Sequence, residues 1–104
     1  MTYLIVFCTV SSRGEARKIS DALLKARLAA CVNILPSIES RYLWKKKREK
    51  AREFLLLIKT RSSLFPKLSK EIRRHHSYSV PEIIGLPILK GNSDYLRWLA
   101  EQTR

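Results

Sequence analysis

Three segments of this chain are apolar at consecutive positions and rich in the branched and aromatic residues typical of strands: Tyr3–Val10, Phe54–Ile58 and Ile83–Leu89. Successive side chains of a strand point to opposite faces of its sheet, so a continuous apolar run predicts burial on both faces. Any fold for this chain must therefore cover both sides of a sheet. This requirement restricts the fold more than any other feature of the sequence.

Two amphipathic helices are predicted between the strand-like segments. The run Ser12-Arg13-Gly14-Glu15 has the spacing of a capping box. Behind it, apolar residues recur three and four apart on one stripe: Ala16, Ile19, Leu23, Ala26 and Ala30. Ser62 and Ser63 are candidate caps of the second helix, in which Pro66 is tolerated in the first turn. The apolar side of that helix consists of Phe65, Leu68 and Ile72.

A long strand pair is predicted between the two helices. Extended structure starts at Cys31–Leu35, and Pro36 marks an edge, a bend or a bulge because it cannot donate to a strand ladder. Ile38, Tyr42 and Trp44 then share one face at period two. A charged turn over Lys45–Arg52 leads into a strand over Glu53–Thr60.

The order of elements is strand, helix, strand, strand, helix, strand, with a terminal helix after Gly91-Asn92. This is the split β-α-β plan, so the predicted class is α+β, a ferredoxin-like βαββαβ antiparallel sheet with an extra C-terminal helix. A chain of 104 residues is long enough for one domain, residues 1–104, and too short for two.

The two long helices of this plan cover only one face of the sheet. Several hundred Å² of apolar sheet would then remain in water, which is unusual for a monomer. We therefore expect an obligate oligomer that packs sheet on sheet. The alternative is that the terminal helix covers part of the second face.

The chain carries a net charge of +12, from 21 Lys and Arg against 9 Asp and Glu. Such an excess raises affinity for any polyanion without indicating specificity. The basic run Lys45–Arg52 lies beside Tyr42 and Trp44, and aromatic neighbours are what single-strand binders use for stacking. The alternative is a solvated hairpin tip, since both aromatics share the apolar period of their strand. Nucleic acid is not expected as a partner, although the charge does not exclude it.

The only two histidines stand side by side in a loop that also holds a phenol and a carboxylate. Together with Cys8, the pair His75 and His76 offers ligands suited to copper or zinc. The alternatives are a histidine pair at a helix C-terminus, favourable to the helix dipole, and a buried Cys8 thiol. Glu82 lies in a mainly apolar segment and needs a partner, for which Lys59 is a candidate at a subunit seam; contact with a ligand is the alternative.

Several classes of protein are excluded or not expected. The apolar runs are far shorter than a membrane span, and residues 1–10 lack the features of a signal peptide, so we expect a cytoplasmic protein that does not span a membrane. With three glycines the chain cannot build a Gly-rich phosphate cradle, and no catalytic triad is present. A hydrolase or transferase using Glu82 and His76 rests on proximity alone, so we do not expect an enzyme.

Together these residues resemble the CutA divalent-cation tolerance family. The matching pieces occur in the family's order over nearly the whole chain: Phe7-Cys8-Thr9, Leu28-Ala29-Ala30-Cys31-Val32-Asn33, Tyr42-Leu43-Trp44, Leu57-Ile58-Lys59-Thr60, His76-Ser77-Tyr78, Pro81-Glu82-Ile83 and Gly91-Asn92-Ser93-Asp94-Tyr95-Leu96-Arg97-Trp98-Leu99. The resemblance implies a tight homotrimer built like the nitrogen-regulatory PII trimers, and a role in tolerance of copper or other divalent metals.

The resemblance also assigns site residues. It implies copper-associated ligands at Cys8, His75 and His76, and an inter-subunit cleft lined by Lys59, Tyr78 and Glu82. Two departures stand out: Ser77 replaces the usual Pro after the second His, which is expected to loosen the loop, and Lys45-Lys46-Lys47-Arg48 replaces an acidic hairpin. We expect a trimeric, metal-responsive, non-enzymatic protein. The alternatives are a PII-like trimer that binds a small ligand or a partner, and a polyanion-binding module using residues 45–52.

Overall fold

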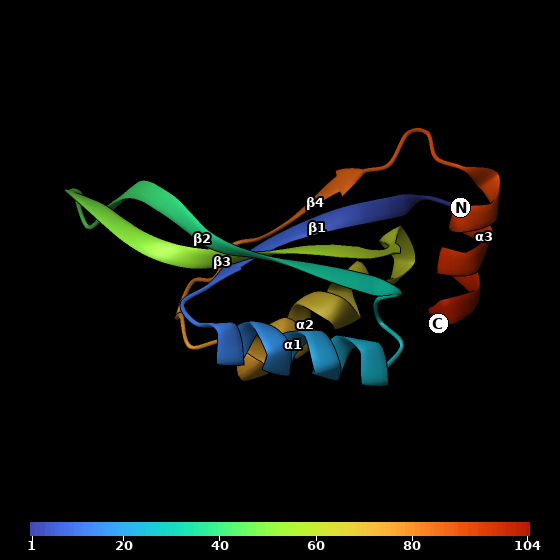
Figure 1. Ribbon diagram of the computed structural model, residues 1–104, viewed down its shortest axis with the longest axis horizontal. Coiled ribbons are helices and arrows are strands. Elements are labelled where there is room, and N and C mark those ends of the chain that lie inside the picture. The colour runs from blue at the N-terminus through green and yellow to red at the C-terminus, as the bar shows by residue number, and fades with distance from the viewer.

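A four-stranded antiparallel sheet with the strand order β2-β3-β1-β4 organises the computed structural model, which describes residues 1–104 (Figure 1). The elements are β1 (Tyr3–Val10), α1 (Arg13–Lys25), β2 (Cys31–Trp44), β3 (Lys47–Arg61), the 3-10 turn η1 (Ser62–Leu64), α2 (Phe65–His75), β4 (Ile83–Pro87) and α3 (Ser93–Gln102). The predicted ferredoxin-like order, with an extra C-terminal helix, is confirmed. None of the helices is long and apolar enough to cross a lipid bilayer.

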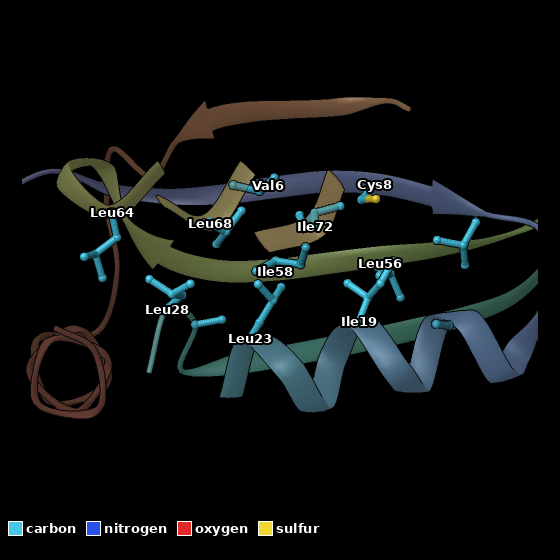
Figure 2. Close-up of a cluster of buried hydrophobic side chains, with 13 residues drawn as sticks. Val6, Cys8, Ile19, Leu23, Leu28, Leu56, Ile58, Leu64, Leu68 and Ile72 are labelled. Atoms are coloured by element: carbon cyan, nitrogen blue, oxygen red, sulfur yellow. The ribbon is translucent and has the colours of Figure 1, made fainter. Parts of the chain in front are cut away.

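Helices α1 and α2 pack together against one face of the sheet, and the core lies between the two layers (Figure 2). The sheet contributes alternate residues of β1 and β3, and the helices contribute one stripe each. The fully buried large side chains of this layer include Val6, Cys8, Leu56, Ile58, Ile19, Leu23, Leu68 and Ile72. The predicted stripe of α2 and the first part of the predicted stripe of α1 therefore face the core, because three- and four-residue spacing brings their members onto one side of a helix.

Helix α1 is shorter than its sequence pattern predicts. The Ser12 hydroxyl accepts a hydrogen bond from the Glu15 N–H, so the predicted N-terminal cap is confirmed. The helix ends at Lys25 because Arg27 adopts a left-handed conformation with φ of 59°. Ala26 is therefore exposed at the helix end and Ala30 lies beyond it, so the apolar stripe stops at Leu23.

The predicted charged turn is mostly strand. Only Lys45 and Lys46 form the turn, both with positive φ, while Lys47–Arg52 belong to β3 and pair with Glu39–Trp44. The segment has no Gly or Pro to stop pairing, so β2 and β3 continue as a two-stranded ribbon. Figure 1 shows this ribbon extending beyond both helices, at the end of the molecule opposite α3. Strand β4 is shorter than predicted and ends at Pro87, consistent with its position at the sheet edge.

A β-bulge at Pro36 and Ser37 changes which residues of β2 face which side. Before the bulge, Leu35 lies opposite Leu55, and after it Ile38 lies opposite Glu53, so two residues of β2 stand against Phe54 alone. Ser37 has φ of 58°, a left-handed conformation that accommodates the extra residue. Because facing residues share a side of the sheet, the bulge turns Ile38, Tyr42 and Trp44 onto the face opposite α1 and α2.

The face opposite α1 and α2, here called the open face, is apolar and uncovered, as the sequence predicts. Strand register places the following side chains on it: Ile5, Phe7, Leu35, Leu55, Leu57, Ile84 and Leu86. Ile84 is 52% exposed and Leu86 49% exposed. Helix α3 lies at the end of the sheet, where Arg27 donates to its last carbonyls and Arg61 donates to Thr103. It contacts open-face residues such as Arg61 at that end only, and leaves Ile84 and Leu86 about half exposed.

We expect Leu68→Ala to lower the free energy of unfolding by about 2–5 kcal/mol, because Leu68 is fully buried and its truncation leaves a cavity between α2 and the sheet. Urea denaturation followed by circular dichroism at fixed protein concentration measures the change. Leu43→Ala is the matched control, since that leucine is 74% exposed; an equal loss in both variants would contradict this account of the core.

Candidate functional site

A cleft of about 540 Å³ lies where the β2–β3 ribbon leaves the body of the sheet. The end of β1, the ribbon and the loop after α2 enclose it. Its lining is Thr9, Ser40, Arg41, Tyr42, Trp44, Glu53, Tyr78, Ser79, Val80 and Glu82. Aromatic rings and carboxylates thus converge on one hollow, which is a common composition for small-ligand sites.

A short hydrogen bond in the cleft joins Tyr78 to Glu53. The Tyr78 hydroxyl donates to Glu53 Oε2 at 2.7 Å, and Glu53 is only 6% exposed. Burial raises the pKa of Tyr78, and the hydrogen bond to Glu53 raises it further, so the phenol stays protonated and acts as a donor. Glu53 was not among the predicted site residues. The sequence feature that marks Glu53 is its position: it is a carboxylate between a basic run and the apolar core of β3, and it lies on the same side of the strands as the aromatic residues.

His76 is a structural residue that fastens the loop after α2 to the sheet. Its Nε2 donates to the Thr9 carbonyl oxygen at 2.8 Å, its Nδ1 accepts from the Tyr78 N–H at 3.1 Å, and its side chain is fully buried. The tautomer follows from these partners, because a carbonyl oxygen can only accept. Both ring nitrogens are thus engaged within the chain.

Ser77 strengthens the same loop, contrary to the expectation that it loosens it. Its N–H and hydroxyl both donate to the Glu15 carboxylate at 2.9 Å. Proline has no N–H and could not make the first of these bonds. One side chain at the start of α1 thus holds the loop through two hydrogen bonds from Ser77.

His75 points away from His76. It lies in the last turn of α2, where its Nε2 is 3.1 Å from Glu71 Oε2. The hydrogen bond with His75 lowers the pKa of Glu71, and Arg74 adds to the effect. This position fits the reading of a histidine at a helix C-terminus.

Cys8 lies on the helix-covered face, inside the core layer of Figure 2. Burial raises the pKa of its thiol from 9.0 to about 12, and the carboxylates of Glu82, Glu15 and Glu53 add to the shift. The thiol is therefore protonated at neutral pH, and only the thiolate is a good metal ligand. Cys31, half-buried, is also a free cysteine.

The structure does not bring Cys8, His75 and His76 together as one metal-binding group. No cluster of three or more His, Cys, Asp or Glu side chains is arranged to hold a metal ion within the subunit. Metal binding through these three residues remains a prediction.

Of the second predicted set, Tyr78 and Glu82 line the cleft, but Lys59 does not. Lys59 faces Ile5 across the sheet and donates to the Asn33 side chain, whereas the cleft begins at Thr9. Four residues of strand separate Ile5 from Thr9, which is about 14 Å. The predicted Lys59–Glu82 ion pair is absent within the subunit, where Glu82 forms no salt bridge.

Comparison with known proteins gives a consistent result. Residues 4–102 match the model of the CutA1 divalent ion tolerance protein family. The chain is 48% identical over 99 residues to the divalent-cation tolerance protein CutA of Thermus thermophilus, covering 95% of this chain and 96% of that protein. It is 45% identical over 101 residues to the chloroplastic CutA protein of Arabidopsis thaliana, covering 97% of this chain and 56% of that protein. The crystal structure of CutA1 from Oryza sativa superposes with a TM-score of 0.97 at 42% identity, covering 100% of this chain and 95% of that one.

Fold and site together define a ferredoxin-like α+β protein with one bare apolar sheet face and a carboxylate-lined cleft at the edge of that face. The match to the family model and the similarity to its members identify the chain more narrowly than this structural class does. The chain belongs to the CutA1 divalent ion tolerance family. It spans nearly all of the bacterial relative and a little over half of the plant protein.

We expect the Cys8 thiol to be unreactive in the folded protein, because its pKa of about 12 leaves almost no thiolate near pH 8. In a Cys31→Ser variant, iodoacetamide should label no thiol natively and one after unfolding, as measured by mass spectrometry. The pKa is raised in the folded state, so the stability gained from the protonated thiol is present below pH 9.0 and lost as the pH rises toward 12. Rapid native labelling would contradict the burial of Cys8.

Proposed function

We propose that this protein is a homotrimer that binds a divalent cation in clefts at its subunit seams and so contributes to tolerance of divalent metal ions. Membership of the divalent ion tolerance family supports the class of activity. The observation that carries the site is the cleft in which the buried Glu53 carboxylate, the Tyr78 hydroxyl and Glu82 converge.

The bare open face supports the assembly. At about 25 cal/mol per Å², burying its apolar side chains stabilises an oligomer by many kcal/mol before the costs of association. Half-exposed Ile84 and Leu86 lie on one edge strand, and half-exposed Tyr42 and Trp44 lie on the ribbon, so the apolar surface runs across the whole sheet. The three-fold order rests on the family resemblance.

A seam between subunits also accounts for the position of Lys59. Within one subunit it lies about 14 Å along the sheet from the cleft. In the arrangement that the resemblance implies, Lys59 of the partner subunit would complete the cleft beside Tyr78 and Glu82.

Oxygen atoms are the ligands that the cleft offers. Carboxylate and phenol oxygens suit hard divalent cations, and Glu53 keeps one oxygen free of the Tyr78 bond. Three carboxylates lie near the end of β1 in a chain of net charge +12, as their joint effect on the pKa of Cys8 indicates. Copper bound by Cys8, His75 and His76 is the competing proposal; it requires ionisation of a thiol with a pKa of about 12 and release of His76 from Thr9.

We propose binding and not catalysis as the activity, because the two obvious reactive groups are held in structural roles. His76 has both nitrogens engaged and Cys8 is a buried, protonated thiol. A second candidate is a small organic ligand, which the cleft volume favours: about 540 Å³ is ample for a molecule larger than a bare ion. Two free cysteines fit a reducing compartment, so we further propose a cytoplasmic location.

We expect Ile84→Glu to dissociate the oligomer, because it places a charge on an apolar face that the assembly buries. Analytical ultracentrifugation at micromolar concentration should give a trimer mass for the native protein and a smaller species for the variant. Leu43→Glu is the control and should leave the mass unchanged. A stable native monomer would contradict the assembly.

We expect Glu53→Gln and Glu82→Gln each to weaken cation binding tenfold or more, since each removes a charged oxygen ligand from the cleft. Isothermal titration with Mn²⁺, Zn²⁺ and Cu²⁺ measures the affinity. Glu101→Gln, an exposed carboxylate on α3, should bind like the native protein. Unchanged binding in the cleft variants together with loss in His75→Ala would favour the Cys8/His75/His76 set instead.

A further inference from the structure

The β2–β3 ribbon carries a concentration of basic side chains, most of which neither line the cleft nor lie on the open face. From Arg41 to Arg52 the chain has seven Lys or Arg residues and one Glu. The ribbon extends from the body and contributes to the 44 Å long axis of the subunit (Figure 1). This charge is therefore displayed on a projecting element of the surface.

The register separates the ribbon into two chemically different faces. Residues directly opposite in an antiparallel pair lie on the same side. Trp44 with Lys47, Tyr42 with Glu49 and Ser40 with Ala51 lie on the side that continues the open face. The other side, here called the basic face, pairs Leu43 with Arg48, Arg41 with Lys50 and Glu39 with Arg52.

Three of the four cations on the basic face form no salt bridge. Arg48, Lys50 and Arg52 are exposed and form no salt bridge, and the one acid on this face, Glu39, is paired with Arg41 at 2.7 Å. Arg13, at the start of α1, continues the stripe onto the body, where its guanidinium lies 5.0 Å from the Phe54 ring centroid. Phe54 follows Arg52 by two residues and shares its side of β3.

The two residues of the turn at the tip are lysines, although their backbone conformation favours Gly, Asn or Asp. Lys45 and Lys46 have φ of 50° and 66°, a left-handed conformation at both central positions of a two-residue hairpin. Such turns strongly favour Asn-Gly or Asp-Gly. Two lysines there place two further cations at the leading edge of the ribbon.

We propose that the basic face of the β2–β3 ribbon binds double-stranded DNA through its phosphates, without reading sequence. A two-stranded ribbon fits a B-DNA major groove about 12 Å wide. The charges repeat at every second residue of β3, about 7 Å apart, so several phosphates can be contacted together. In an oligomer that buries the open face, the basic face on the other side of the ribbon stays accessible.

The aromatic and basic side chains lie on opposite faces of the ribbon, and this arrangement favours duplex DNA over other polyanions. Single-strand binding depends on aromatic platforms beside the basic groups, but Tyr42 and Trp44 lie on the opposite face. A membrane surface needs apolar anchors among the cations, and the basic face offers only Leu43. The expectation from sequence that nucleic acid is not a partner is replaced by this proposal, which is independent of any ligand in the cleft.

Fluorescence anisotropy with a labelled, mixed-sequence DNA duplex tests the proposal. Between about 50 and 200 mM salt we expect a steep loss of affinity, since each neutralised phosphate contributes a slope of about −0.9. The triple variant Arg48→Gln/Lys50→Gln/Arg52→Gln should bind at least tenfold more weakly at low salt and reduce the slope by about 2–3.

A matched control separates location from total charge. Lys67→Gln/Lys70→Gln/Arg73→Gln removes the same charge from exposed positions of α2 and should bind DNA like the native protein. Circular dichroism and sedimentation should show both variants folded and assembled alike. Equal weakening in both variants, tighter binding to single-stranded RNA than to the duplex, or binding only to phosphatidylserine vesicles would each overturn the proposal.

Discussion

The central strands β1 and β3 are apolar on both faces, while α1 and α2 together cover only one of them. The helices bury one set of side chains, which includes Cys8, Leu56 and Ile58. The other set, which includes Phe7 and Leu57, faces a side of the sheet that no second layer of the subunit covers. The position of α3 at the sheet end preserves this asymmetry. The assembly we propose, and the location of the cleft at the margin of the bare face, both follow from it.

The loop after α2 connects this sheet to the cleft. His76 and Ser77 tie the loop to Thr9 and Glu15, and the same turn delivers the Tyr78 ring to Glu53. Side chains that resemble ligands in the sequence thus act as positioning groups. What they position is a protonated phenol against a buried carboxylate, at the junction of body and ribbon. The electrostatics of the cleft therefore differ sharply from the strongly basic average of the chain.

The element order and the covered core could be predicted from the sequence, because apolar period and capping residues such as Ser12 are local signals. The sequence predicts a charged turn where the structure has a long ribbon, because pairing between Arg48 and Leu43 depends on register and not on local preference. For the candidate site, Tyr78 and Glu82 were predicted from the loop and from the resemblance, and both line the cleft. Glu53 was missed, and the distance between Lys59 and the cleft was not foreseen, because both depend on how distant strands align. A histidine's hydrogen-bond partners are likewise set by tertiary contacts, so the closed environment of His76 had no sequence signature.

The bulge at Pro36 and Ser37 has a consequence for how this protein can change over evolutionary time. One extra residue there decides the orientation of every side chain in the outer half of β2. Deletion of either residue would turn Tyr42 and Trp44 over, placing the rings among the arginines of β3 and pointing Arg41 into the apolar side. Substitutions in this stretch are thus far less consequential than changes in its length. In related sequences, the number of residues between Leu35 and Ile38 should vary less than their identity.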